Sequence, residues 1–289
     1  MKLSAHRISS FRRLVYDYYR LHGRRLPWRT TRDPYRILVS EVMLQQTQIA
    51  RVLPIYRRFL VRFPNAEALA RASLAEVLSV WQGLGYNRRA HYLHQTAQTL
   101  QVKYKGKVPR SFEELEALPG IGEYTAQAVM VFAFNQSHPL VETNIRSAIL
   151  QEFFPRSRRV LERKVHSIVK QTIDSSNPRE WFYALMDYGS HLKSLSPGIN
   201  QRSAAYRKQS PFRGSLRQTR GAILRTLTMR GALSVSALRR VMPDHQGLEQ
   251  AIGKLLKEGL LLRNGHDRLS IPGQSSVSAR TSGARESKR

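Results

Sequence analysis

Apolar side chains recur every three to four residues over most of positions 4–193, a spacing that predicts amphipathic helices. The clearest run lies between Pro34 and Pro64 and predicts helical structure from one proline to the other. Ser73 followed by Glu76 predicts a capping box at a helix start. Alternating β-branched positions are nearly absent, so the pattern predicts a mainly α fold. The remaining predicted helices cover 65–71, 73–81, 86–104, 111–118, 123–134, 144–153, 161–173 and 178–192.

The pattern changes near residue 194. Positions 194–214 are rich in Ser, Pro, Gly, Asn and Gln, which is typical of a linker. Helical spacing returns at 216–228, 234–241 and 246–258, and two short apolar runs, 260–263 and 268–271, follow. Asn264-Gly265 separates these runs and predicts a β-hairpin. Three helices closed by a hairpin predict a small winged-helix-like domain.

These patterns divide the chain into four predicted parts. They are an all-α domain at 1–193, a basic linker at 194–214, the winged-helix-like domain at 215–272 and a disordered tail at 273–289. Residues 201–240 contain ten Lys and Arg and no acidic residue. A solvated surface could carry such a run, but in this chain we favour contact with phosphates.

Charge narrows the class of partner. The 289 residues include 48 Lys and Arg against 20 Asp and Glu, a net charge of +28. Such an excess favours a nucleic-acid partner, with an anionic membrane surface as the second choice. No apolar run is long enough to cross a bilayer. We expect a monomer in the cytoplasm, associated with the nucleoid. The Arg-rich start loosely resembles a transit peptide, but its spacing fits an amphipathic helix better.

Cysteine is absent from the sequence. This excludes disulfides, thiolate zinc sites, cysteine nucleophiles and cysteine-ligated iron–sulfur clusters. The nine histidines show no metal-ligand spacing, and His91 and His94 have no third ligand placed near them. We therefore expect neither a metal nor another cofactor.

The segment Leu118-Pro119-Gly120-Ile121-Gly122 carries the most specific signal in the chain. A short predicted helix ends there, two glycines allow a tight turn, and the next predicted helix begins at once. N–H groups at such a turn and helix start can bind an anion. An ordinary helix–helix turn is the simpler interpretation, but the Gly-Ile-Gly spacing favours a hairpin that binds a DNA phosphate.

This segment resembles the helix-hairpin-helix motif of base-excision DNA glycosylases, and the chain is similar to the adenine DNA glycosylases of the MutY type. Those enzymes remove adenine mispaired with guanine or 8-oxoguanine. The similarity spans about residues 10–193 and follows the order of the family. Besides the hairpin, it is carried by 26–29 (LPWR), 33–35 (DPY), 40–48 (SEVMLQQTQ), 81–86 (WQGLGY), 141–144 (VETN) and 186–189 (MDYG).

The candidate catalytic residues include two glutamates. Glu41 lies among apolar positions of a predicted helix, which raises the pKa of a carboxyl group and suits a general acid. The resemblance assigns Glu41 the protonation of adenine N7. It assigns Glu142 the stabilisation of a cationic sugar, although the family usually has Asp there. It makes Asn144 the residue that orients this site. Tyr124 stands where bifunctional relatives have a Lys, so we expect no strong strand-nicking activity.

The resemblance also implies contacts with the two bases of a mismatch. Its adenine pocket would be formed by Trp28, Arg29, Leu44, Ile49 and Asp187. Its contacts with the opposite base and the surrounding DNA would be made by Gln46, Thr47, Leu84 and Tyr86.

Two features of the family are missing from the sequence. The four cysteines that ligate a [4Fe–4S] cluster have no counterpart after Gly189. The domain that resembles a nucleotide-triphosphate hydrolase and reads 8-oxoguanine is replaced by the winged-helix-like segment. The preference for 8-oxoguanine over guanine therefore stays open.

Two alternative functions remain. A glycosylase for thymine or uracil opposite guanine could use the same scaffold, also with Tyr at the hairpin. A catalytically inactive DNA-binding protein could keep the hairpin, but it would have no need for Glu41 in an apolar helix.

Overall fold

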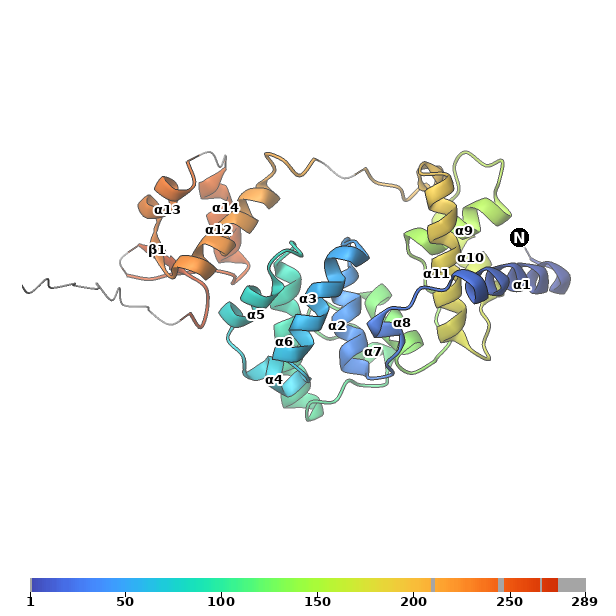
Figure 1. Ribbon diagram of the computed structural model, residues 1–289, viewed down its shortest axis with the longest axis horizontal. Coiled ribbons are helices and arrows are strands. Elements are labelled where there is room, and N and C mark those ends of the chain that lie inside the picture. The colour runs from blue at the N-terminus through green and yellow to red at the C-terminus, as the bar shows by residue number, and fades with distance from the viewer. Residues whose placement is uncertain (1, 209–210, 244–246, 266, 275–289) are drawn as a thin grey trace, which may run out of the picture. The chain divides into compact units, whose positions relative to one another are not determined.

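The computed structural model describes residues 2–208, 211–243, 247–265 and 267–274. They form two compact units (Figure 1). The first unit comprises the described residues of 1–70 and 95–209, and the second comprises the described residues of 71–94 and 210–289. Helix α6 (Arg88–Tyr104) contributes residues to both. None of the described helices is long and apolar enough to cross a membrane.

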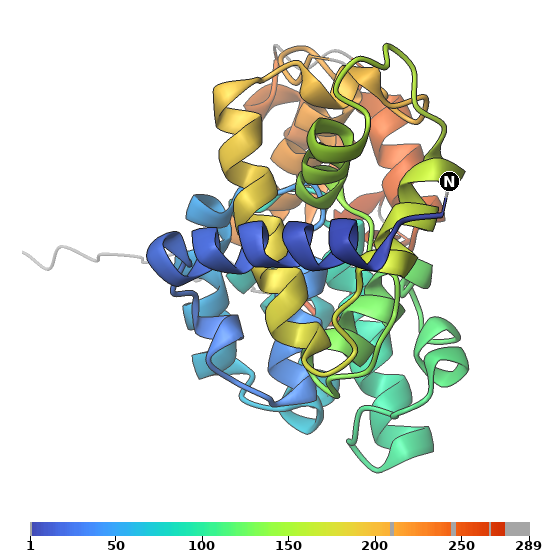
Figure 2. The ribbon, with the colours of Figure 1, turned by 90° about the vertical axis from the view of Figure 1, so that its right-hand side faces the viewer.

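The core of the first unit forms around the last long helix before the basic segment. Figure 2 shows helix α1 (Ala5–His22) lying across α11 (Pro178–Leu195). The Phe11 and Trp181 rings pack nearly perpendicular to each other, with centroids 5.7 Å apart. The predicted N-terminal amphipathic helix is confirmed, with Phe11 and Val15 on its buried face. The other helices of this unit are α2 (Pro34–Leu44), α3 (Ile49–Arg62), α4 (Ala66–Arg71), α7 (Phe112–Glu116), α8 (Glu123–Phe132), α9 (Thr143–Phe153) and α10 (Glu162–Thr172), with 3₁₀ turns η1 (Pro27–Arg29) and η2 (Ile199–Arg202).

The helical run predicted between Pro34 and Pro64 is two helices, so the expected continuity is wrong. Helix α2 ends at Leu44 and α3 begins at Ile49. Gln46, between them, has a φ of 52°, in the left-handed region. Apolar periodicity continues across the break, and no Gly or Pro marks it. The connection therefore places a polar, backbone-strained turn directly after the helix that carries Glu41.

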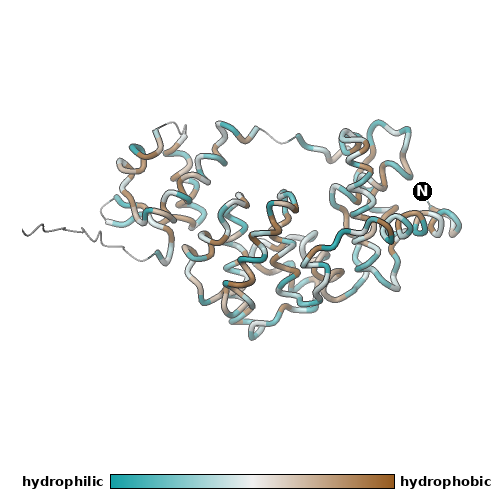
Figure 3. The backbone as a smooth tube through the Cα atoms, in the orientation of Figure 1, coloured by the Kyte–Doolittle hydropathy of each residue, from teal (hydrophilic) through white to brown (hydrophobic). Residues whose placement is uncertain are grey.

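Local sequence signals explain where several helices start. The Asp33 carboxylate accepts hydrogen bonds from the Tyr35 and Arg36 N–H groups, and Pro34 occupies the first turn, where its missing N–H costs nothing. The capping box of Ser73 and Glu76 is present at the start of α5 (Leu74–Trp81). Apolar and polar positions mix along these helices, as Figure 3 shows.

The second unit joins α5 and the start of α6 to the C-terminal elements. These are α12 (Leu216–Arg230), β1 (Leu233–Ser234), α13 (Val235–Val241), α14 (Leu248–Lys257), β2 (Leu262–Arg263) and β3 (Arg268–Ser270). The strands β2 and β3 pair antiparallel, as predicted, and β1 pairs with the other edge of β3. The sequence did not predict β1, which is two residues long. The predicted three helices and hairpin are therefore present, and the winged-helix-like fold stays a prediction.

Residues 194–206 are more ordered than a linker. Helix α11 continues to Leu195, and η2 follows at Ile199. The backbone then pairs with the start of α10, since the Val160 and Ala204 N–H groups donate to the Arg202 and Val160 carbonyls, each at 2.8 Å. The predicted disordered tail, 273–289, lies outside the described residues except for Gly273 and Gln274.

Candidate active site

Glu41 is a buried carboxyl group in the middle of the first unit. Its helix, α2, turns most of its residues inward, and Glu41 is 8 % exposed. Burial raises the pKa of Glu41 to about 8, and the negative charge of Glu142 adds to the increase, whereas Arg29 opposes it. A carboxyl group with this pKa holds its proton at neutral pH. Glu41 can therefore act as a general acid.

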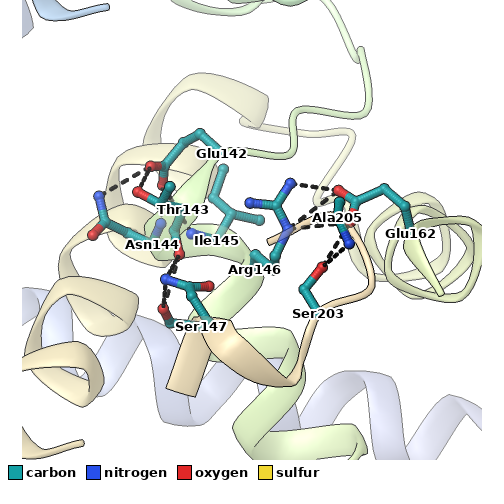
Figure 4. Close-up of polar contacts among 10 residues, drawn as sticks. Glu142, Thr143, Asn144, Ile145, Arg146, Ser147, Glu162, Ser203 and Ala205 are labelled. Atoms are coloured by element: carbon teal, nitrogen blue, oxygen red, sulfur yellow. Dashed lines mark hydrogen bonds and ion pairs between the residues drawn. The ribbon is translucent and has the colours of Figure 1, made fainter. Parts of the chain in front are cut away.

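Glu142 is an anchored carboxylate at the start of α9 (Figure 4). Its Oε1 accepts hydrogen bonds from the Asn144 and Ile145 N–H groups, each at 2.8 Å. Its Oε2 accepts from the Asn144 side-chain amide and the Thr143 hydroxyl, both at 3.1 Å. Glu142 is thus the N-cap of α9 and lies at the positive end of that helix. The site therefore pairs a buried carboxyl group that holds its proton with a second carboxyl group that is fixed by hydrogen bonds at a helix start.

The predicted hairpin lies between α7 and α8. Gly120 has a φ of 72°, and Gly122 is an exposed N-cap. Ile121 is buried, and its N–H donates to the Leu118 carbonyl at 3.1 Å, so this N–H is used inside the turn. The groups left for an anion are those of Gly122 and the first turn of α8.

Tyr124 belongs to the first turn of α8, next to the two carboxyl groups. Burial raises the pKa of the Tyr124 phenol well above 10, and the charges of Glu41 and Glu142 raise it further. The phenol therefore stays protonated at neutral pH. It is a poor nucleophile in this state, and it has no amine to form a Schiff base.

Arg29 and Asp187 form a buried ion pair beside Glu41. Two Arg29 nitrogens donate to the two Asp187 oxygens, each at 2.8 Å, in a bidentate arrangement. Asp187 also accepts from the Arg24 backbone N–H at 2.8 Å. Burial raises the pKa of Asp187, but the hydrogen bonds and charges of Arg29 and Arg24 more than compensate and leave it lowered. The Arg29 guanidinium lies 4.6 Å from the centre of the Tyr183 ring.

The other residues predicted for the adenine pocket lie in the same unit. Trp28 is buried and packs edge-on against Tyr56, with ring centroids 5.3 Å apart, which is a core contact. Leu44 and Ile49 are half-buried at the two ends of the α2–α3 turn.

The residues predicted to contact DNA are divided between the two units. Gln46 is exposed and Thr47 is half-buried on the α2–α3 turn of the first unit. Leu84 and Tyr86 belong to the second unit, where Leu84 is 2 % exposed and Tyr86 is 39 % exposed. Gln46 and Tyr86 both have a left-handed backbone, with φ of 52° and 48°. Strain of this kind collects at functional sites.

A hydrogen-bonded segment that the sequence did not reveal holds α9 in place. The Asn200 amide donates to the Thr143 carbonyl and to the Ser147 hydroxyl, both at 3.0 Å. Arg202 donates to the Leu150 carbonyl at 3.1 Å and to the Phe154 carbonyl, so it satisfies groups at the C-terminal end of the same helix. We call residues 199–206 the α9 clasp.

An ion pair links α9 to α10, and a hydrogen bond joins the α9 clasp to the same glutamate of α10 (Figure 4). Arg146 donates from Nε to both Glu162 oxygens at 3.2 Å, and the Ser203 hydroxyl donates to Glu162 at 3.2 Å. The clasp begins a few residues after α11, in the stretch where the family would have its cluster cysteines. It contains Ser, Asn, Gln and Arg and no thiol, so these residues do not fit an iron–sulfur cluster. Among the described residues, no group of three or more His, Asp or Glu side chains could hold a metal ion.

Comparison with known proteins identifies the family. A family model described as "HhH-GPD superfamily base excision DNA repair protein" matches residues 39–171. An adenine DNA glycosylase from Mycolicibacterium smegmatis is 36 % identical over 282 residues, which cover 88 % of this chain and 93 % of the relative. This chain belongs to the adenine DNA glycosylase family of the helix-hairpin-helix superfamily.

Two further similarities show how far this likeness extends. An adenine DNA glycosylase from Buchnera aphidicola subsp. Baizongia pistaciae is 35 % identical over 62 % of this chain, which spans only 52 % of that relative. A solved structure of a thermostable thymine-DNA glycosylase superposes with a TM-score of 0.57 and 26 % identity, over 64 % of this chain and 87 % of the other. The mainly α helix-hairpin-helix fold expected from the sequence is confirmed.

Proposed function

We propose that this chain hydrolyses the N-glycosidic bond of adenine in DNA duplexes where adenine is mispaired with guanine or 8-oxoguanine. The observation that carries the proposal is the pair of carboxyl groups, of which Glu41 is buried with a pKa of about 8 and Glu142 is anchored by hydrogen bonds from two backbone N–H groups. The family to which the chain belongs supports the choice of adenine.

In the proposed reaction, Glu41 donates its proton to N7 of the extruded adenine as the bond between C1′ and the base nitrogen breaks. The bonding electrons leave with the base, and the sugar becomes an oxocarbenium-like cation. The Glu142 carboxylate stabilises this positive charge. Water then adds to C1′ and loses a proton, which leaves an abasic site. Protonation and charge stabilisation each lower the barrier of the same bond cleavage.

The same arrangement supports a monofunctional reaction. Strand cleavage through a Schiff base needs an amine at the sugar, and the position that supplies it in bifunctional relatives holds Tyr124, whose pKa is raised further by the two carboxyl groups. The proposed chemistry is carried by side chains of the chain alone.

Duplex DNA is the proposed partner. A net charge of +28 favours a polyanion, and the exposed start of α8 offers N–H groups to a phosphate. Gln46 and Thr47 lie on the turn that follows the Glu41 helix, where they can approach the base opposite adenine.

Single-turnover assays on four labelled duplexes test this proposal. The duplexes carry 8-oxoG:A, G:A, G:T or G:U, and each product is divided into samples with and without hot alkali. The proposal expects strand breaks at adenine that require alkali, because the product is an intact abasic strand. Breaks at T or U would place the activity in the thymine and uracil mismatch class. Breaks at adenine without alkali would contradict the monofunctional mechanism.

A further inference from the structure

The turn that carries Tyr86 is held in an unusual backbone conformation. Gly83, Gly85 and Tyr86 have φ values of 95°, 72° and 48°, and only Tyr86 has a side chain to disfavour the left-handed region. Leu84 is buried beneath the turn, whereas the Tyr86 ring remains 39 % exposed. A strained, exposed aromatic residue persists where the surrounding structure holds it.

Part of that support comes from the residues next to the turn. The Trp81 indole N–H donates to the Gly85 carbonyl at 3.1 Å. The Arg89 guanidinium lies 5.3 Å from the centre of the Tyr86 ring and 5.6 Å from that of Trp81. These contacts fix the backbone and one side of the ring, but none of them reaches the Tyr86 hydroxyl.

The Tyr86 hydroxyl is held from the C-terminal segment. Arg217 donates to it at 2.7 Å, and the same guanidinium lies 5.8 Å from the ring centre. Arg217 is in the first turn of α12, which starts at a Ser215 cap that accepts from the Gln218 N–H. Tyr86 and Arg217 belong to the same compact unit.

Two further contacts attach the C-terminal segment on either side of the turn. Glu258, at the end of α14, pairs with Arg220 of α12 and lies 3.9 Å from Arg88 at the start of α6. The Ala75 N–H of α5 donates to the Pro272 carbonyl at 3.3 Å. We call the described residues from 211 to 274 the C-terminal module. These contacts attach it to α5, before the Tyr86 turn, and to α6, after the turn.

We propose that Arg217 is a positioning residue for Tyr86, and that the C-terminal module thereby takes part in extruding the target base. The proposal rests on the proposed function and on the DNA contact that the resemblance implies for Tyr86, whose ring would insert between bases while adenine leaves the stack. A hydrogen bond from a charged donor and a cation near the ring limit the ring to few orientations before DNA arrives. The Tyr86 side chain therefore loses less conformational entropy when the base is extruded.

A double-mutant cycle in the full-length chain tests this role. Tyr86→Phe removes only the hydroxyl and keeps the ring, and Arg217→Ala removes its donor. Arg225→Ala is the matched control, because Arg225 is exposed on the same helix about two turns further on. Each variant is assayed for single-turnover excision of adenine, for duplex affinity, and for fluorescence of 2-aminopurine placed beside the mismatch.

We expect Arg217→Ala and Tyr86→Phe each to slow excision by about tenfold, as for the loss of one charge-assisted hydrogen bond. The double variant should be no slower than either single variant, and Arg225→Ala should slow excision less than Arg217→Ala does. The affinities of Arg217→Ala and Arg225→Ala should be equal, since each variant loses one positive charge.

Two results would overturn the proposal. Additive losses in the double variant, or a loss of affinity confined to Arg217→Ala, would make Arg217 a phosphate contact that acts independently of Tyr86. Failure of the proposed function is recognised separately, because the wild type would then excise no base. The 2-aminopurine signal still reports unstacking in that case, and equal signals from the wild type and Arg217→Ala would overturn the positioning role.

Discussion

At the residue scale, the site depends on two glutamates whose side chains have different surroundings. Glu41 lies on a helix that is buried on nearly every side, and Glu142 accepts four hydrogen bonds at a helix start. Desolvation favours the neutral form of the first, and N–H donors hold the second in a fixed position. The difference between their surroundings gives each carboxyl group its own proposed role.

Glu41→Gln should stabilise the protein, and the gain should grow with pH. Because the pKa of Glu41 is raised from 4.5 to about 8, the folded state binds more protons than the unfolded state between these values. Glu41 therefore lowers the stability of the wild type as pH rises through this window, by about 4 kcal/mol. Urea unfolding at pH 5 and pH 8.5 measures the difference in free energy of unfolding between the wild type and Glu41→Gln. A difference that does not change with pH would contradict the raised pKa.

Glu142→Asp should slow excision, although Asp is the usual residue of the family at this position. The shorter side chain can still cap α9, but it withdraws the carboxylate from the sugar by about one bond. A misplacement of about 1 Å can cost about 100-fold in rate. Single-turnover assays of Glu142→Asp and Glu142→Gln check this, with Thr143→Ala as a control that removes only a neighbouring hydroxyl. A faster Glu142→Asp enzyme would show that the site is built for the shorter residue.

The sequence predicted the role of Glu41 because apolar neighbours on its helix predict burial, and burial raises the pKa of a carboxyl group. The sequence did not predict the contacts of Asn200 or Arg202. Both lie in a Ser-, Pro- and Gly-rich stretch whose composition is typical of a linker. Their partners are backbone carbonyls 45 or more residues away, which leave no pattern in a single sequence.

At the element scale, the position of α9 depends on a close crossing with α11. A Cβ atom at Gly189 would lie 1.9 Å from the Asn144 carbonyl oxygen, so only glycine allows this approach. Gly189→Ala should push away the first turn of α9, which carries Glu142 and Asn144, and should lower both stability and excision rate. Thermal unfolding and single-turnover assays measure the two effects.

Gly221→Ala is the matched control for that experiment. Gly221 lies within α12, and a Cβ atom added there would meet nothing within 4 Å, so alanine should stabilise the helix by about 0.5–1 kcal/mol. Equal behaviour of the two variants would contradict the close crossing at Gly189.

The α9 clasp should contribute measurably to stability. Arg202→Met removes hydrogen bonds to carbonyl groups near the end of α9 and leaves them without this donor, at a cost of about 1–3 kcal/mol. Lys208→Met removes the same charge from an exposed position on the same segment and should cost less than about 0.5 kcal/mol. Urea unfolding compares the free energies of unfolding of Arg202→Met and Lys208→Met. Equal losses of stability in the two variants would mean that the clasp does not hold α9.

The apolar periodicity of the sequence does not by itself locate the ends of helices and strands. The capping box at Ser73 fixes the start of α5 by local chemistry, and it was predicted correctly. The break between α2 and α3 depends on the left-handed backbone of Gln46, which has no Gly or Pro signal. The strand β1 contains two residues and exists only because β3 pairs with it.

At the scale of the whole molecule, charge controls the proposed encounter with DNA. Each phosphate neutralised by the protein releases counterions, so the logarithm of the binding constant should fall with the logarithm of salt concentration by about 0.9 per contact. With a net charge of +28, we expect a steep slope, equivalent to at least about five contacts. Fluorescence anisotropy of a labelled duplex at salt concentrations from about 50 to about 200 mM measures it. A flat response would contradict binding to the DNA backbone.

The most direct test of the central claim is the pH dependence of adenine excision by the wild type and Glu41→Gln under single-turnover conditions. The wild-type rate should be constant at neutral pH and fall as pH rises through about 8, where Glu41 loses its proton. Glu41→Gln should bind the same duplex with unchanged affinity and excise adenine at least about 100-fold more slowly. Excision by Glu41→Gln at the wild-type rate would show that the buried carboxyl group is not the acid.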